Sequence, residues 1–266
     1  MMLIDIGVNL SNQQFKNRIT DVLTRALSAG VEKIILTGTS ISESRAAVAL
    51  CEEYQSQFPN MLYATAGIHP HEANSWDTAS YRSIKELASH SAVVAIGETG
   101  LDFNRNLSTP KEQEVAFEAQ LELSTELQMP LFLHERDAAK RQLDILTHHR
   151  ESISNAVIHC FTGDKKTLFS YLDLDLYIGI TGWVCDERRG LELQKIIKNI
   201  PLNRLMVETD APYLLPRNMT PLPKNRRNEP AFLEYIVRCI SEHREESEEV
   251  ISKMTTATAL EFFELD

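Results

Sequence analysis

Eight short apolar runs, each ending in polar residues and followed by a helical segment, recur along this chain. The runs are LIDIGVN (3–9), KIILTGT (33–39), LYATAGIHPH (62–71), VVAIGETGLD (93–102), PLFLHERD (130–137), NAVIHCFTG (155–163), LYIGITGWV (176–184) and LMVETDAPY (205–213). Continuous apolar strands that alternate with helices indicate a parallel sheet covered by helices. Eight such units in about 210 residues predict an α/β fold of the (β/α)8 TIM-barrel type rather than an open sheet.

The segments between the runs have helical patterns. Residues 41–54 and 110–127 are amphipathic and long enough for helices. Pro110 suits a first helical turn, and either Thr109 or Ser108 is placed to cap it. These two segments therefore predict helices that cover the sheet.

The rest of the chain gives no sign of a second domain. No linker or change of composition interrupts the 266 residues, so we expect one barrel domain over 1–266. Residues 230–264 are expected to form terminal helix.

No apolar stretch approaches the roughly 18–20 residues of a membrane span, and MMLIDIG lacks the features of a signal peptide. The four cysteines form no CxxC pair, which is typical of reduced thiols in a cytoplasmic protein.

Histidines and carboxylates gather at the ends of the predicted strands. The carboxyl ends of the strands build the active site of a TIM barrel. The residues there are His69, His71, Glu98, His134, His159 and Asp210. Such a cluster, converging from separate strands, is what a divalent-metal site needs.

Seven motifs in the same order carry a family resemblance. They are GIHPH, IGETGLD, LFLHERD, HCFTG, GITGWV, VETDAPYLLP and RRNEP. This set resembles the TatD family of metal-dependent deoxyribonucleases over essentially the whole chain. The resemblance implies an amidohydrolase-like barrel with one or two divalent metals and exonuclease hydrolysis of phosphodiesters from a 3′ end. It also implies a role in DNA repair or nucleic-acid turnover, Glu98, His134 and His159 as metal ligands, and Asp210 as the strand-eight aspartate.

The first predicted strand departs from that family pattern. Most family members carry D-x-H-x-H there, whereas this chain has Gly7 and Asn9 at the two histidine positions. We therefore expect one metal position to be weakly held, absent, or completed by substrate and water. Restoring histidine at both positions is expected to tighten binding of a second ion.

The tip residues can be given roles in hydrolysis. Asp210 can orient or deprotonate the attacking water, or ligate the metal as well. His69 and His71 either contact the substrate phosphate or pack as structural groups under the proline turn. Arg136 is expected to face the phosphate.

Residues beyond the tips supply candidates for holding a nucleic-acid strand. Lys224, Arg226 and Arg227 follow strand eight and could receive backbone phosphates, or form a solvated loop. Trp183 and Tyr213 could stack an unpaired base or pack at the rim. The net charge of −11 disfavours broad binding to duplex nucleic acid, so we expect single-stranded ends as substrate for a monomeric, cytoplasmic enzyme.

The metal and the reaction class stay open at this point. The family resemblance implies Mg²⁺, whereas two imidazoles and two carboxylates suit Mn²⁺ or Zn²⁺. One alternative is an amidohydrolase acting on a small amide or lactone, although the strand-one histidines and a strand-tip lysine are missing. A second alternative is a non-catalytic quality-control protein, since a fold never proves a function.

Overall fold

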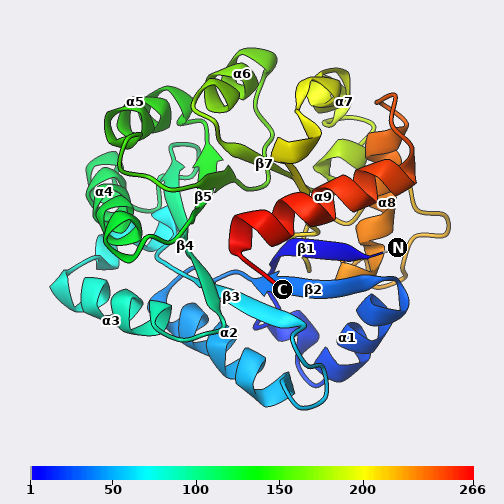
Figure 1. Cartoon of the computed structure of the whole chain (residues 1–266), viewed down its shortest axis with the longest axis horizontal. Coiled ribbons are helices and arrows are strands. Elements are labelled where there is room, and N and C mark those ends of the chain that lie inside the picture. Colours follow the sequence, from blue (N-terminus) through cyan, green and yellow to red (C-terminus); the bar gives the residue numbers. More distant parts are fainter. Residues whose placement is uncertain (1) are drawn as a thin grey trace.

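The strands of the computed structural model, which describes residues 2–266, form one parallel sheet in the order β1 to β8 (Figure 1). They are β1 Leu3–Val8, β2 Val31–Leu36, β3 Leu62–Ala66, β4 Val93–Asp102, β5 Leu131–Arg136, β6 Ala156–Ile158, β7 Tyr177–Ile180 and β8 Leu205–Val207. Each predicted run supplies one strand, so the expected α/β barrel is confirmed.

The first and last strands meet through a few specific contacts rather than a full ladder. Val8 forms an isolated parallel bridge with Ala211, and the Asp210 N–H donates to the Gly7 carbonyl at 2.9 Å. The fully buried Asp5 carboxylate accepts the Thr209 N–H at 2.8 Å and the Thr209 hydroxyl at 2.5 Å. These contacts nearly close the barrel. They hold the end of β1 against the segment that follows β8.

Helices separate the strands and cover the outside of the sheet (Figure 1). They are α1 Ile19–Ser28, α2 Ile41–Tyr54, α3 Thr78–Ala88, α4 Pro110–Leu127, α5 Ala139–His149, α6 Lys165–Asp173, α7 Leu191–Ile196, α8 Leu233–Ser241 and α9 Glu248–Phe263. The two helices expected over 41–54 and 110–127 are confirmed. Thr109 is the cap of α4, in a reciprocal capping box with Glu112.

The terminal segment differs from the expected helix over 230–264. It consists of a short 3-10 turn, Pro230–Phe232, and then α8 and α9, which are separated by residues 242–247. Ser247 caps α9 by accepting the Val250 N–H, and such a cap starts a new helix instead of extending the previous one.

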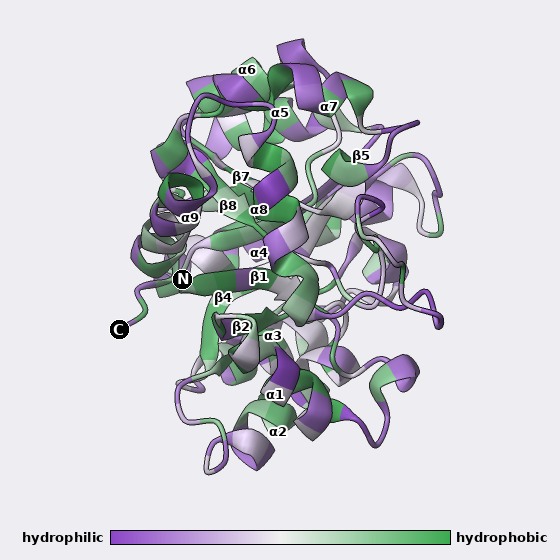
Figure 2. Ribbon diagram, turned by 90° about the vertical axis from the view of Figure 1, so that its right-hand side faces the viewer, coloured by the Kyte–Doolittle hydropathy of each residue, from purple (hydrophilic) through white to green (hydrophobic). Residues whose placement is uncertain are grey.

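Apolar side chains fill the inside of the barrel at the end away from the polar tips. The inward-facing cluster comprises Ile4, Ile6, Ile35, Ala95, Phe132, Val157, Tyr177 and Met206, together with Ala259, Phe262 and Phe263 of α9. Helix α9 crosses the barrel beside β1 and closes this end (Figure 1). The strands are coloured mainly as hydrophobic, whereas the helices mix both kinds of residue (Figure 2). The opposite end is thereby left for the polar site.

Within residues 2–266, no helix combines the length and the apolar character that crossing a membrane requires.

Candidate metal and substrate site

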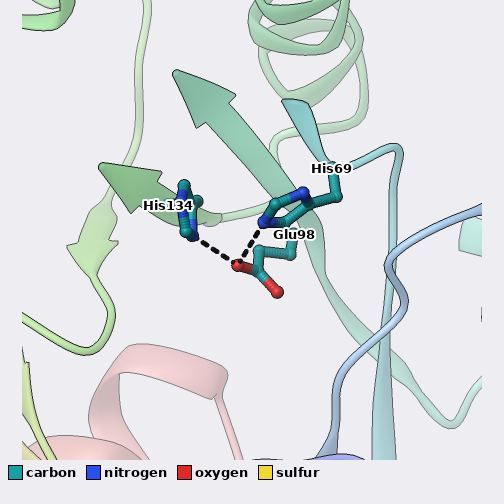
Figure 3. A group of neighbouring side chains, drawn as sticks. All are labelled: His69, Glu98 and His134. Atoms are coloured by element: carbon teal, nitrogen blue, oxygen red, sulfur yellow. Dashed lines mark hydrogen bonds and ion pairs between the residues drawn. The ribbon is translucent and has the colours of Figure 1, made fainter. Parts of the chain in front are cut away.

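Three histidine side chains converge on a single carboxylate oxygen at the strand tips. Glu98 Oε1 lies 3.2 Å from His69 Nε2, 2.8 Å from His134 Nδ1 and 2.9 Å from His159 Nε2. Figure 3 shows His69 and His134 pointing at the Glu98 carboxylate from opposite sides. Glu98 lies within β4 and His134 within β5, His159 directly follows β6, and His69 lies three residues after the end of β3. Four consecutive strands therefore contribute to one cluster, as the sequence predicted.

Two glycines in β4 allow this approach between strands. Gly97 has φ +146°, and a Cβ there would lie 2.2 Å from the Phe132 carbonyl oxygen of β5. Gly100 has φ +138°, and its Cβ would lie 2.0 Å from the carbonyl oxygen of His134. Because only glycine tolerates both the conformation and the contact, these positions set Glu98 against His134.

A second buried carboxylate, Glu208, holds His159 from behind. Glu208 has no exposed surface, its Oε2 lies 3.2 Å from His159 Nδ1, and its Oε1 accepts the Cys160 N–H at 2.5 Å. A carboxylate on Nδ1 fixes the ring and leaves Nε2 facing the cluster, as in many metal-binding histidines. Sequence reasoning missed this residue, although its place directly after strand eight, two positions before Asp210, was a usable signal.

Asp210 is held over the cluster by the amide of Asn9. Asn9 Nδ2 donates to Asp210 Oδ1 at 3.0 Å, and Asp210 itself adopts φ 53°. Asn9 therefore contributes a hydrogen-bond donor to the aspartate. Its amide nitrogen also donates to the Ala211 carbonyl at 3.4 Å, so Asn9 joins strand one to the segment after strand eight.

His71 pairs with a carboxylate that the sequence analysis did not single out. His71 Nε2 lies 2.6 Å from Asp102 Oδ2, and Asp102 also accepts the N–H groups of Asn104 and Arg105. Burial alone would raise the pKa of Asp102, but these hydrogen bonds and the His134 ring hold it well below its usual value. Asp102 is therefore an ionised group beside the cluster.

The electrostatics of the cluster are those of tightly paired acids and bases. Burial alone would raise the pKa of Glu98, but the imidazoles of His159 and His69 hold it well below its usual value. Burial would lower the pKa of His159, but the carboxylates of Glu98 and Glu208 raise it well above 6.5. Burial lowers the pKa of His69 to about 4, so this ring is neutral at pH 7. Enclosure by the protein raises the pKa of Asp210 to about 7.

The cluster opens into a cavity of about 980 Å³. Besides the cluster, its lining includes Asn104, Arg105, Arg136, Trp183 and Tyr213. The predicted Arg136, Trp183 and Tyr213 thus lie where an entering strand would pass.

The basic loop after strand eight lies elsewhere. None of Lys224, Arg226 and Arg227 lines the cavity. Arg227 donates to the Gln14 carbonyl at 2.8 Å and its guanidinium lies 5.4 Å from the centre of the Phe15 ring. Arg226 is exposed, so the structure does not bring these cations to the strand-tip cluster.

The set of residues that could hold a metal overlaps with the predicted one. Donor atoms of His69, Glu98 and His134 lie within 4.8 Å of one another. His134 Nδ1 faces Glu98, while its buried Nε2 forms no hydrogen bond within the accepted geometry and lies 3.6 Å from Asp102 Oδ2. The predicted set named His159 and Asp210 where this group has His69.

Comparison with known proteins identifies the family. A family model described as "TatD related DNase" matches residues 4–264. The chain belongs to the TatD family. Its sequence is 50% identical over 263 residues to the "3'-5' ssDNA/RNA exonuclease TatD" of Salmonella typhimurium, with 99% of each chain covered. The resemblance inferred from the motifs is thereby confirmed.

Solved structures place the TatD-family fold among related barrels. YJJV, a TatD homolog from Escherichia coli, superposes with a TM-score of 0.89 at 26% identity and covers 99% of this chain and 98% of that one. Amidohydrolase 2 from Bifidobacterium longum subsp. infantis covers all of both chains with a TM-score of 0.58 at 12% identity, which shows the shared fold alone. The expected amidohydrolase-like barrel is confirmed, and TatD membership together with the His/Glu cluster indicates a divalent metal.

Proposed function

We propose that this chain is a metal-dependent exonuclease that removes nucleotides from the 3′ ends of single-stranded DNA or RNA. The observation that carries the proposal is the convergence of His69, His134 and His159 on Glu98 Oε1 at the strand tips. Half of the sequence is identical, over nearly the whole length, to a relative whose name states this activity. We also propose that the enzyme acts in the cytoplasm as a monomer, with a role in DNA repair or nucleic-acid turnover.

Glu98, His134, His159 and Asp210 are the residues that would hold the metal. Imidazole nitrogens with carboxylate oxygens suit Mn²⁺ or Zn²⁺, whereas Mg²⁺, implied by the family resemblance, prefers oxygen. When bound, a divalent ion lowers the pKa of water and neutralises charge on a phosphate. Nδ1 of His134 and Nε2 of His159 both face Glu98 Oε1, at 2.8 and 2.9 Å, which supports this assignment.

His69 acts as a hydrogen-bond donor in this proposal. The His71 N–H donates to His69 Nδ1 at 3.0 Å, so Nδ1 carries no proton. The ring is neutral, and its single proton therefore lies on Nε2. A protonated nitrogen does not ligate a metal, but it donates well to a carboxylate or to a phosphate oxygen. His69 is thereby a substrate contact, which was one of its two expected roles.

Asp210 takes the proton of the attacking water. Its carboxylate is positioned by the Asn9 amide at 3.0 Å, and a nearby cation would keep it ionised and able to accept a proton. Cavity residues Arg136 and Arg105 can meet the negative charge of the phosphate, and Trp183 and Tyr213 offer faces for unpaired bases. A cavity of this size admits a strand end more readily than the middle of a duplex.

The alternative of a small-amide hydrolase is less well supported. No lysine is among the described residues that line the cavity, so the carboxylated lysine that often bridges two metals in such enzymes has no candidate here. The non-catalytic alternative does not explain a buried charged cluster beside an open cavity, because such groups are costly without a function.

A labelled oligonucleotide separates these functions. A single strand labelled at its 5′ end should shorten stepwise in the presence of Mg²⁺ or Mn²⁺, and chelation should stop the reaction. His159→Ala and Glu98→Ala should be folded and inactive, whereas Glu72→Gln, on the exposed rim, should retain activity. Efficient nicking of covalently closed circular duplex would contradict the proposed substrate. No hydrolysis by the metal-loaded wild-type protein would contradict the proposed activity.

A further inference from the structure

Two thiols, an imidazole and a carboxylate gather between η3 and the end of α8, outside the strand-tip cavity. Cys185 is the last residue of η3, Gly182–Cys185, and Cys239 lies in the last turn of α8. Glu242 and His243 directly follow that helix. None of the four lines the cavity described above. Three of the four are close in sequence, but the fourth comes from the segment after β7.

The donor atoms of these residues are close in space. One atom each of Cys239, Glu242 and His243 lies within 4.8 Å of the other two. Cys185 lies next to this group, because the Cys239 thiol contacts the carbonyl of the preceding residue, Val184, at 3.5 Å. The Glu242 charge acts on both thiols. Cys185 and Cys239 are buried, His243 is partly exposed and Glu242 is exposed. The group is therefore a buried sulfur pair with an opening to solvent.

The orientation of His243 favours ligation. Its Nδ1 donates to the Cys239 carbonyl at 2.8 Å, which leaves the lone pair on Nε2. A ring N–H on a backbone carbonyl is the usual companion of a metal-binding histidine. Among residues 2–266, the Glu242 carboxylate has no hydrogen-bond or ion-pair partner. The Glu242 carboxylate can therefore bind a cation without giving up another contact, and His243 can bind one through Nε2.

Packing alone accounts for only part of this arrangement. Each thiol donates a weak bond to a backbone carbonyl, Cys185 to Tyr235 at 3.7 Å and Cys239 to Val184 at 3.5 Å. Those contacts satisfy two buried cysteines, but they do not explain an acid and an imidazole at the same point.

We propose that Cys239, Glu242 and His243, with the adjacent Cys185 as fourth ligand, form a second metal site for a thiophilic divalent cation of the zinc class. Two thiolates, one imidazole and one carboxylate match the ligand types and number of a structural Zn²⁺ site, whereas Mg²⁺ requires oxygen. Binding releases the two thiol protons to solvent. The site would tie the segment after β7 to α8, and with it Trp183, which lines the catalytic cavity two residues before Cys185. This inference does not depend on the proposed nuclease activity.

Cobalt is a suitable probe because thiolate ligation gives Co²⁺ a sulfur-to-metal absorption that nitrogen and oxygen ligands do not give. Metal-free full-length protein, kept reduced with a phosphine, is titrated with Co²⁺. The absorption should saturate at one ion per chain, fall to half or less in Cys239→Ser and be displaced by Zn²⁺. Cys160→Ser is the matched control for the catalytic cavity, and Cys51→Ser is the control for a buried cysteine on α2; both should keep the absorption.

Partly exposed ligands give a test that does not disturb the core. His243→Gln should weaken Co²⁺ affinity at least about tenfold while circular dichroism is unchanged. A folded wild-type protein without the sulfur absorption would overturn the proposal. Loss of the absorption in Cys160→Ser but not in His243→Gln would also overturn it, because the cobalt would then lie in the catalytic cavity.

Discussion

The carboxylate of Glu208 occupies the space beside Gly7, where an added Cβ would lie only 2.3 Å from Glu208 Oε2. Glu208 in turn contacts His159 and Cys160, so the missing side chain at Gly7 makes room for the carboxylate that orients His159. This geometry argues against the expectation that histidine at position 7 would tighten metal binding, because a side chain there would displace the group that orients His159.

Gly7→Ala is therefore expected to destabilise the protein by about 1–3 kcal/mol, the usual cost of overpacking, and to lower activity. Urea unfolding and the oligonucleotide assay measure the two effects. In a Glu208→Ala background the added methyl group meets no carboxylate, and its cost should be smaller. Equal costs in both backgrounds would show that the two residues are not coupled.

Glu208→Gln should weaken metal binding about 10–100-fold, since the amide cannot hold His159 Nδ1–H as strongly as a carboxylate does. Titration calorimetry with Mn²⁺ measures the affinity. Glu72→Gln removes a charge from the same cavity without touching His159, and it should leave the affinity unchanged. If both variants bind equally well, Glu208 only fills space.

Metal affinity should rise as the pH increases from 6 to 8. In the metal-free protein Asp210 has a pKa of about 7 and the pKa of His159 is raised, so both carry protons that compete with the cation at lower pH. Calorimetry in two buffers of different protonation enthalpy should detect proton release, and Asp210→Asn should release fewer protons. An affinity that stays constant over this range would refute the explanation.

His69→Ala should leave the metal affinity unchanged and lower kcat about 10²-fold, since a donor to the transition state is lost but no ligand is. His134→Ala should instead weaken the metal. The two affinities and the two rates, measured side by side, distinguish donor from ligand. A His69 variant that loses the metal as His134→Ala does would make His69 a ligand.

Arg136→Ala should raise KM for single strands and reduce the slope of log affinity against log salt by about 0.7, the value for one phosphate contact. Arg226→Ala is the matched control, because Arg226 is exposed and does not line the cavity. The expectation from sequence included Arg226 and Arg227 as phosphate contacts. A larger effect of Arg226→Ala than of Arg136→Ala would restore it.

The sequence by itself determined the barrel and most of the strand-tip residues. Apolar runs, polar tips and helical spacing are local signals, and the carboxyl ends of parallel strands meet at one rim whatever the side-chain details. Glu98, His134 and His159 could therefore be placed together before any coordinates, and Thr109 and Pro110 marked the start of α4. The break between α8 and α9 was missed, although the uninterrupted polar run SEHREESEE (241–249) was a local signal for it.

Only the tertiary structure decided which groups share a proton, a contact or a space. Glu208 meets Gly7, Asn9 meets Asp210, and Cys239 meets Val184 across some 200, 200 and 50 residues of chain. The tautomer of His69 likewise depends on one backbone N–H in the following turn. Such relationships follow from side-chain direction and packing within a few ångströms, which residue type and spacing do not encode.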